Sequence, residues 1–302
     1  MITFSEELYQ IIGVAQSIIS YMRTINIGAA VDRRMNDTAT KGNAGTRTSV
    51  SRALEIIDAL ARRESLGVTE LAEVLDLSKS TVHAYLKTLE QSGYVVRDGE
   101  KYALGYKLSL LGESVRNQSR LYQIARDEID DLAAQTELYA HLTVAEDGRG
   151  VNLYQAKGDD VGRYDYQTEK VQHPEPLHVT AAGKAILAAL SRERVESILD
   201  RHGLPRRTPH TVTDRDALIE ELSTIDERGY AYNDEEEIEG FRAVGASICG
   251  QDGEVLGALS VSGPKSILHG DCFREESTDA VTRTADLIEV TITMSNTFPS
   301  NS

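Results

Sequence analysis

LSKSTVHAYLKTLEQSGYVVR, residues 77–97, is the stretch that decides the fold of the first part of this chain. Its residues Val82, Leu86 and Leu89 recur at the spacing of one helix face, and Ser78 stands where a helix N-cap is preferred. The hydroxyl and basic residues of the stretch then face outward, near the start of the helix. Such a surface suits contact with a polyanion.

The residues around this helix predict the rest of a small domain. Upstream, a helix from Thr48 is ended by Gly67, and Thr69 caps a second helix, TELAEVLDL. The apolar face of the first helix comprises Val50, Ala53, Leu54, Ile57, Leu60 and Ala61. Downstream, YVVR and KYAL flank the turn residues Asp98 and Gly99, which predicts a hairpin. Three helices followed by a hairpin form a winged helix-turn-helix, here over residues 47–107.

In a winged helix-turn-helix the third helix reads DNA. The outward residues of the predicted third helix are Lys79, Ser80, Thr81, His83, Ala84 and Lys87. Hydroxyls and backbone N–H groups at its start suit phosphate oxygens, whereas His83 and Ala84 could meet base edges. Arg97 on the hairpin and Arg52 on the first helix complete the predicted DNA-binding set. The alternative is a surface helix in a protein-interaction domain.

The distribution of charge favours DNA. The formal net charge is −16, with 48 acids against 32 bases. Residues 47–107 hold 9 bases and 9 acids, whereas residues 120–302 hold 18 bases and 34 acids, so the whole excess lies there. With only 9 Lys against 23 Arg, no Trp and 4 Phe, the composition is typical of a protein adapted to concentrated salt.

The N-terminal residues and the two cysteines indicate the cellular compartment in which the protein works. Residues 1–46 are predicted to be disordered or a leader absent from the native protein, with translation then starting at Met35; a short helix packing on a partner is the alternative. Their apolar runs are too short for a membrane span. Two cysteines are too few for a disulfide framework, which suits a cytoplasmic protein without membrane contact.

The remaining residues predict an α+β domain. Residues 108–119 form a linker helix, residues 120–296 a second domain, and residues 297–302 a tail. Helices are predicted over 180–190, 215–229 and 277–294, with hairpins turning at Asp147-Gly148 and Asp252-Gly253.

Two predicted strands of this domain each present a row of mostly small side chains. One row comprises Ala243, Gly245 and Ser247, and the other comprises Leu256, Ala258, Ser260 and Ser262. Small residues there imply either a close-packed helix or a hollow. The segment TAAGKA, 180–185, could fill or rim that hollow, with its helix-start N–H groups open to an anion.

The chain resembles the IclR (isocitrate lyase regulator) family of transcription factors over about residues 48–296. The resemblance lies in the winged-helix run from SVSRALEII to LSLLG, and in PLHVTAAGKAIL, RGYAYNDEEEIEGFRAVGASI and GALSVSGP. It implies a GAF-like effector domain that senses a small organic acid or aromatic metabolite, an operator in double-stranded DNA, and a homodimer or dimer of dimers. The effector lining that it implies is Ala181, Ala182, Asn233, Phe241, Ala243, Ser260 and Ser262.

This sequence departs from the family's pattern at three of these places. Relatives usually carry Arg where Ala84 stands, often Asp for Asn233, and often Leu for Phe241. The operator and the effector therefore do not carry over from relatives. Two functions remain as alternatives: an architectural DNA-binding protein with a ligand-free second domain, and an enzyme with a fused winged helix.

An enzyme is not expected, because the small-residue faces offer Ser260 and Ser262 without a matched His. No cofactor and no metal are expected either, since His269 and Cys272 supply two ligands only.

Overall fold

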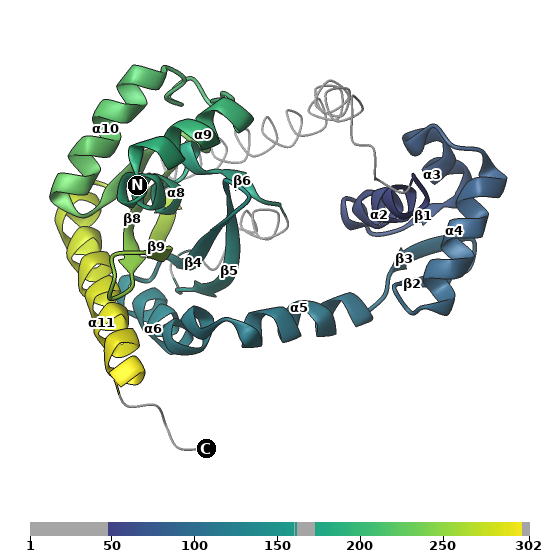
Figure 1. Cartoon of the computed structure of the whole chain (residues 1–302), viewed down its shortest axis with the longest axis horizontal. Helices are drawn as coiled ribbons and strands as arrows, with labels where there is room; N and C mark the ends of the chain where they lie inside the picture. Colours follow the sequence, from purple (N-terminus) through teal and green to yellow (C-terminus); the bar gives the residue numbers. More distant parts are fainter. Residues whose placement is uncertain (1–47, 160, 162–172, 298–302) are drawn as a thin grey trace, which may run out of the picture. The chain divides into compact units, whose positions relative to one another are not determined.

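The computed structural model describes residues 48–159, 161 and 173–297 (Figure 1). The described chain divides into two compact units between Gln118 and Ser119. The predicted leader, residues 1–46, lies outside the described residues, as does nearly all of the predicted tail. No helix among the described residues is long and apolar enough to cross a membrane.

In its described residues, 48–118, the first unit comprises four helices and a small antiparallel sheet in the order β1-β3-β2. Its elements are α2 (Thr48–Ala61), β1 (Leu66–Gly67), α3 (Val68–Leu75), α4 (Lys79–Gln91), β2 (Val95–Asp98), β3 (Lys101–Leu104) and α5 (Lys107–Gln118). The predicted third helix is α4: the Ser78 hydroxyl accepts from the Thr81 N–H at 3.1 Å, and Val82, Leu86 and Leu89 are buried. The hairpin at Asp98-Gly99 is confirmed by the pairing of β2 with β3.

Two sequence predictions about the first unit are wrong. Helix α2 ends at Ala61 rather than at Gly67, because Leu66 and Gly67 pair with β3 as a short strand. Helix α3 then begins directly at Val68, so Thr69 lies inside it instead of capping it. The Glu70 carboxylate accepts from the Gly67 N–H at 2.7 Å and takes over the capping role.

The apolar face of α2 is also rotated from the predicted one. Ile56, Ala59 and Leu60 enter the core, whereas Val50 and Leu54 are each 55% exposed. The helix carries apolar residues on two sides, and only one side meets α3, α4 and β3.

The second unit is an α+β domain, as predicted, on a six-stranded antiparallel sheet in the order β6-β5-β4-β9-β8-β7. Its strands are β4 (Tyr139–Glu146), β5 (Arg149–Lys157), β6 (Glu175–Pro176), β7 (Ala231–Asp234), β8 (Phe241–Cys249) and β9 (Val255–Pro264). Its helices are α6 (Arg120–Thr136), η1 (Leu177–Val179), α8 (Ala181–Ala189), α9 (Arg192–His202), α10 (Arg215–Arg228), η2 (Cys272–Glu276) and α11 (Ser277–Thr297).

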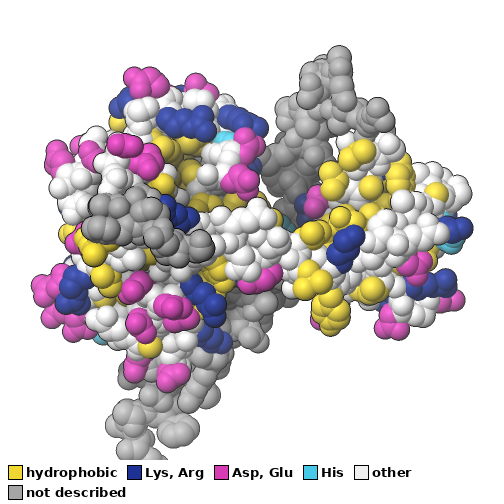
Figure 2. All heavy atoms as spheres, turned by 60° about the horizontal axis from the view of Figure 1, so that its bottom comes forward, with side chains coloured by type: hydrophobic (Ala, Val, Ile, Leu, Met, Phe, Trp, Pro, Cys, Tyr) yellow, Lys and Arg dark blue, Asp and Glu magenta, His cyan; other side chains and the backbone are white. Residues whose placement is uncertain are grey.

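Helices α6 and α11 pack on one face of the sheet, and α8 packs on the other with α10 behind it (Figure 1). Acidic side chains are spread over the surface of this unit (Figure 2). The sequence reading missed α9, although Ser191 caps it and Val195, Ile198 and Leu199 recur on one buried face.

The two predicted rows of small residues lie side by side. Ala243 pairs with Ser262, Gly245 with Ser260, and Ser247 with Ala258. Leu256 does not belong to the second row, because a β-bulge makes Cys249 pair with Val255 and Ile248 pair with Gly257. Leu256 is the extra residue, and it packs in the hydrophobic core on the other face of the sheet, in the cluster that contains Leu259.

The sheet face with the small residues accepts the start of α8 at very short range. A Cβ added at Gly245 would lie 2.8 Å from the backbone carbon of Ala181 and 2.8 Å from the amide nitrogen of Ala182. Of the two alternatives, a close-packed helix or a hollow, the structure therefore has the close-packed helix at this point of the small-residue face. No larger residue fits there without moving α8.

Substituting Gly245→Ala should lower the free energy of unfolding by about 1–3 kcal/mol, because backbone atoms cannot yield to the added methyl. Chemical denaturation followed by near-ultraviolet circular dichroism measures it. Ser247→Ala, two residues along the same strand, removes an atom from a half-buried side chain and should stay within about 0.5 kcal/mol of the parent. Equal stability of Gly245→Ala and the parent would refute the close contact.

Candidate functional site

The outward face of α4 presents the predicted DNA-binding residues. Lys79, Ser80, His83, Ala84 and Lys87 are exposed. Thr81 differs from them in being half-buried. The hydroxyls of Ser80 and Thr81 both contact the Ser78 hydroxyl in the cap of the helix, at 2.9 and 2.8 Å. The Thr81 backbone N–H is likewise committed to Ser78.

Arg97 and Arg52 sit away from the reading helix. The Arg97 side chain is exposed on β2, donates to the Gly99 carbonyl at 2.8 Å and lies over the Tyr102 ring. Arg52 is half-buried on α2 and forms a 2.7 Å ion pair with Glu55. Arg97 is thus held on the hairpin, whereas Arg52 must leave an existing partner to meet a phosphate.

All seven residues of the predicted effector lining lie in one buried region. Ala181 and Ala182 start α8, Asn233 lies on β7, and the other four lie on β8 and β9. Each of the seven is at most 6% exposed. Register places Asn233 beside Ala243 and Ala243 beside Ser262, so the lining crosses three neighbouring strands.

The start of α8 is fixed by two side chains. The Thr180 hydroxyl accepts from the Gly183 N–H at 2.9 Å. The Asn233 amide donates to the Val179 carbonyl at 2.8 Å, while its oxygen accepts from the Glu236 N–H at 2.9 Å. Asn233 therefore ties β7, the segment before α8 and the turn after β7 together.

His141 is a residue of this region that the sequence reading missed. It is buried on β4 beside Ser260, and its Nε2 lies 3.0 Å from the Ser262 hydroxyl. The expectation that no His is matched to these serines is therefore wrong. Only the pairing of β4 with β9, a contact between residues far apart in sequence, could have revealed it.

Polar side chains of the neighbouring strand β5 extend this contact. The Asn152 oxygen accepts from the Thr143 hydroxyl at 3.1 Å, so the Asn152 amide N–H faces His141 Nδ1, 3.4 Å away. Both ring nitrogens of His141 therefore have polar neighbours within the domain, Asn152 at Nδ1 and Ser262 at Nε2.

Behind the start of α8 lies a fully buried lysine. Lys184 forms ion pairs of 2.6 Å with both Glu221 on α10 and Glu236 in the turn after β7. Burial raises the pKa of Glu236, and the attraction of Lys184 only partly opposes this rise. The pKa of the buried His178 is lowered by its burial, and its Nε2 lies 3.2 Å from the Pro205 carbonyl.

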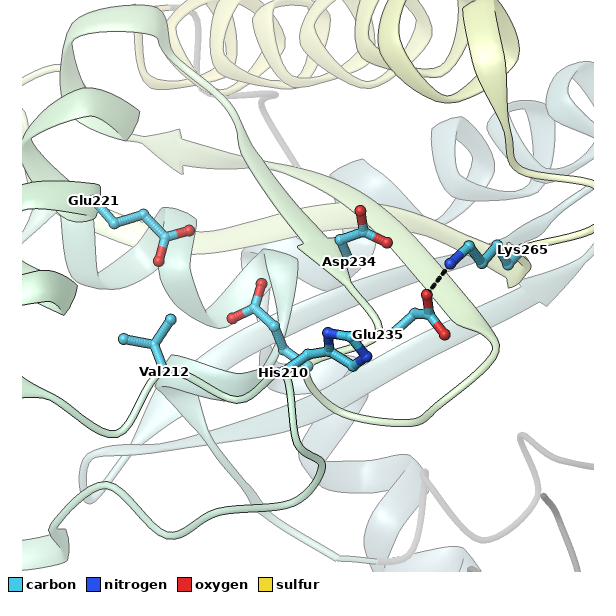
Figure 3. Close-up of a pocket in the computed structure, with 7 residues that line it drawn as sticks. His210, Val212, Glu221, Asp234, Glu235 and Lys265 are labelled. Atoms are coloured by element: carbon cyan, nitrogen blue, oxygen red, sulfur yellow. Dashed lines mark hydrogen bonds and ion pairs between the residues drawn. The ribbon is translucent and has the colours of Figure 1, made fainter.

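An open pocket of about 350 Å³ lies next to this lysine (Figure 3). Its lining comprises His210, Val212, Glu221, Asp234, Glu235, Glu236 and Lys265. Across the described ranges, no group of three or more His, Cys, Asp or Glu side chains is placed to hold a metal ion.

A winged helix with an exposed reading helix, followed by an α+β domain, defines a DNA-binding protein with a second functional domain. Residues 49–99 match the family described as "IclR helix-turn-helix domain", and residues 114–290 match "Bacterial transcriptional regulator IclR C-terminal". The chain belongs to the IclR family of transcriptional regulators, with a helix-turn-helix domain and an effector-binding domain.

Curated relatives and a solved structure agree with this assignment. The probable HTH-type transcriptional regulator ArcR of Halobacterium salinarum is 40% identical over 255 residues, covering 84% of this chain and 97% of that protein. The HTH-type transcriptional regulator KdgR of Dickeya chrysanthemi is 33% identical, covering 72% and 71%. The crystal structure of Thermotoga maritima IclR aligns with a TM-score of 0.67 at 28% identity, covering 81% of this chain and 98% of that one.

Replacing the buried lysine tests its role in holding α8. Lys184→Met leaves Glu236 and Glu221 without their cation, and we expect a loss of about 3–5 kcal/mol at neutral pH. Adding Glu236→Gln should recover part of the loss, because a neutral amide replaces an uncompensated buried carboxylate.

The pH dependence of the Lys184→Met loss has a defined sign. A raised folded-state pKa of Glu236 means that the folded protein binds the proton more tightly. Lys184 lowers the pKa of Glu236, so Lys184→Met raises it further; the penalty is complete above the variant's pKa and shrinks as the pH falls from there toward the lower, still raised pKa of the parent. Denaturation of parent and variant at a series of pH values measures the difference; a constant difference would contradict this origin.

Proposed function

We propose that this regulator binds operator DNA through α4 and the β2–β3 wing, and that a small organic acid or aromatic metabolite bound at the start of α8 changes its affinity for that DNA. It acts as a homodimer or a dimer of dimers, by binding and not by catalysis. The domain limits proposed are 47–107 for DNA, 108–119 for the linker and 120–296 for the effector.

The exposed start of α4 supports the DNA contact. Its hydroxyl and lysine side chains point outward from a segment that carries no net charge, in a protein of net charge −16. Phosphate contacts come from such side chains and from helix-start N–H groups. The role of Ala84 is apolar, for example against a thymine methyl group.

The buried region at the start of α8 is the observation that carries the effector proposal. It gathers the Ser260 and Ser262 hydroxyls and the α8 backbone next to small side chains, and it excludes water. Hydroxyl and N–H donors in such a place complement the oxygens of an acid.

Fluorescence anisotropy with DNA from the region beside the chain's own gene tests the function. A panel of small organic and aromatic acids is added to the complex, and one or more should change the DNA affinity. Ser262→Ala should weaken that response while leaving DNA binding intact. DNA binding that no acid alters would contradict the effector proposal.

The salt dependence of DNA binding tests the reading helix. With Ala84 in place of the arginine usual in relatives, we expect a shallow slope of log association constant against log salt. Ala84→Arg should steepen that slope by about 0.9, the value for one added phosphate contact. Glu90→Gln, at an exposed position near the C-terminal end of α4, raises the net charge by the same one unit but should leave the slope nearly unchanged. Equal slopes for Ala84→Arg and the parent would place α4 away from the DNA backbone.

Exposed apolar residues of the first unit support self-association. Tyr106, Leu110 and Val115 are 91%, 72% and 65% exposed, and Val50 and Leu54 on α2 are also exposed. Apolar surfaces of this kind mark contacts with another chain. A second copy of this unit presents the matching surface.

Substituting Leu54→Glu or Leu110→Glu should shift the protein toward monomer and weaken operator binding, because each places a charge in the proposed interface. Analytical ultracentrifugation measures the mass. Thr224→Glu, an exposed α10 position in the other unit, is the control for added charge and should keep the parent mass. An unchanged mass for both leucine variants would exclude this interface.

A further inference from the structure

The pocket beside Lys184 is distinct from the seven residues of the proposed effector lining. It lies among the α9–α10 loop, α10, the turn after β7 and the residue that follows β9 (Figure 3). Its lining holds four carboxylates, a histidine, one lysine and the apolar Val212.

Most of the pocket's charges already have partners. Lys265 pairs with Glu235, as Figure 3 shows, and Arg242 donates to both oxygens of Asp234 at 2.7 and 3.2 Å. Lys184 pairs with Glu221 and with one oxygen, Oε1, of Glu236. Four carboxylates thus meet three cations, which leaves one negative charge in excess.

The other oxygen of Glu236 lacks a partner. Oε2 is buried and accepts no hydrogen bond, on a residue that is 8% exposed. A buried acceptor without a donor is unfavourable by more than a typical hydrogen bond contributes. In this pocket the missing group is a donor.

The backbone of Glu236 cannot easily relax to satisfy this oxygen. Its N–H donates to the Asn233 oxygen at 2.9 Å, and its carbonyl accepts from the Thr211 hydroxyl at 2.7 Å. Oε1 is fixed by Lys184 at 2.6 Å. A molecule that enters the pocket can supply the donor that Oε2 lacks.

A missing donor and an excess negative charge together specify an N–H cation. The described His, Cys, Asp and Glu side chains form no cluster that could hold a metal ion, and Val212 offers an apolar wall to a carbon chain. We propose that this pocket binds a small organic cation, an ammonium or guanidinium group hydrogen-bonded to Glu236 Oε2. This site goes beyond the proposed function and does not depend on it.

Thermal shift and calorimetric titration of the full chain at constant ionic strength test the proposal. The probes are n-butylammonium and methylguanidinium, compared with tetramethylammonium, which has the charge but no N–H donor, and with Mg²⁺. Saturable binding of either N–H probe is expected, with tetramethylammonium and Mg²⁺ weaker by about tenfold or more. Equal binding of tetramethylammonium, preferred binding of Mg²⁺, or no binding of either N–H probe would overturn it.

Two substitutions with opposite expected effects locate the site. Glu236→Gln should weaken binding of the N–H probe by about tenfold or more, because a charged acceptor is lost. Lys265→Gln should tighten it, because a half-exposed competing cation is removed and Glu235 is released. Glu227→Gln, an exposed α10 position outside the lining, should bind as the parent does.

The tightening by Lys265→Gln keeps the test decisive if Glu236→Gln fails to fold. A general loss of structure cannot increase affinity. Weaker binding by Lys265→Gln, or unchanged binding by a folded Glu236→Gln, would show that the cation does not sit in this pocket.

Discussion

The close approach of α8 to β8 is the constraint on which the effector-binding domain depends. Backbone atoms of Ala181 and Ala182 occupy the space that any side chain at residue 245 would fill. This contact requires glycine at that position and small residues around it. It brings the start of a helix, with its N–H groups, onto a sheet face that carries serine hydroxyls.

Polar contacts on both sides of α8 hold this arrangement in place. On the sheet side, Thr143, Asn152 and His141 form a chain of hydrogen bonds that ends at Ser262. Behind the helix, Lys184 joins α8 to Glu221 and to Glu236. Buried polar groups paired in this way fix the position of α8 more narrowly than apolar packing does, which suits the proposed effector site. Because the Asn233 oxygen accepts from the Glu236 N–H, the proposed effector lining and the acidic pocket share one turn of the chain.

Local signals in the sequence were sufficient for much of the fold. Ser78 caps α4 because its hydroxyl has only to reach three residues along the chain. Asp147 and Gly148 adopt positive φ values of 51° and 78°, which a tight hairpin needs and which their residue types favour. Side chains along β8 and β9 alternate between the two faces of the sheet. This periodicity alone was enough to assign each row of small residues to a single face of its strand. The helices and the hairpin of the winged helix were predictable for the same reason, since their signals also lie close together in the sequence.

Features that depend on distant partners were not accessible. The bulge that displaces Leu256 depends on the pairing of β8 with β9, and His141 meets Ser262 across 121 positions of sequence. The partners of Lys184 come from two segments that only the fold brings together. The rotated face of α2 has a similar cause, since the sequence shows two apolar sides and only the neighbours select the buried one.

The central claim is that the effector binds where α8 meets the small-residue face of the sheet. Backbone amide NMR of the full chain, with and without an acid that changes operator affinity, tests it most directly. We expect the largest shift changes at Ala181, Ala182 and Gly183 and at Ser260 and Ser262. Changes confined to other parts of the second unit, with these amides unmoved, would contradict it.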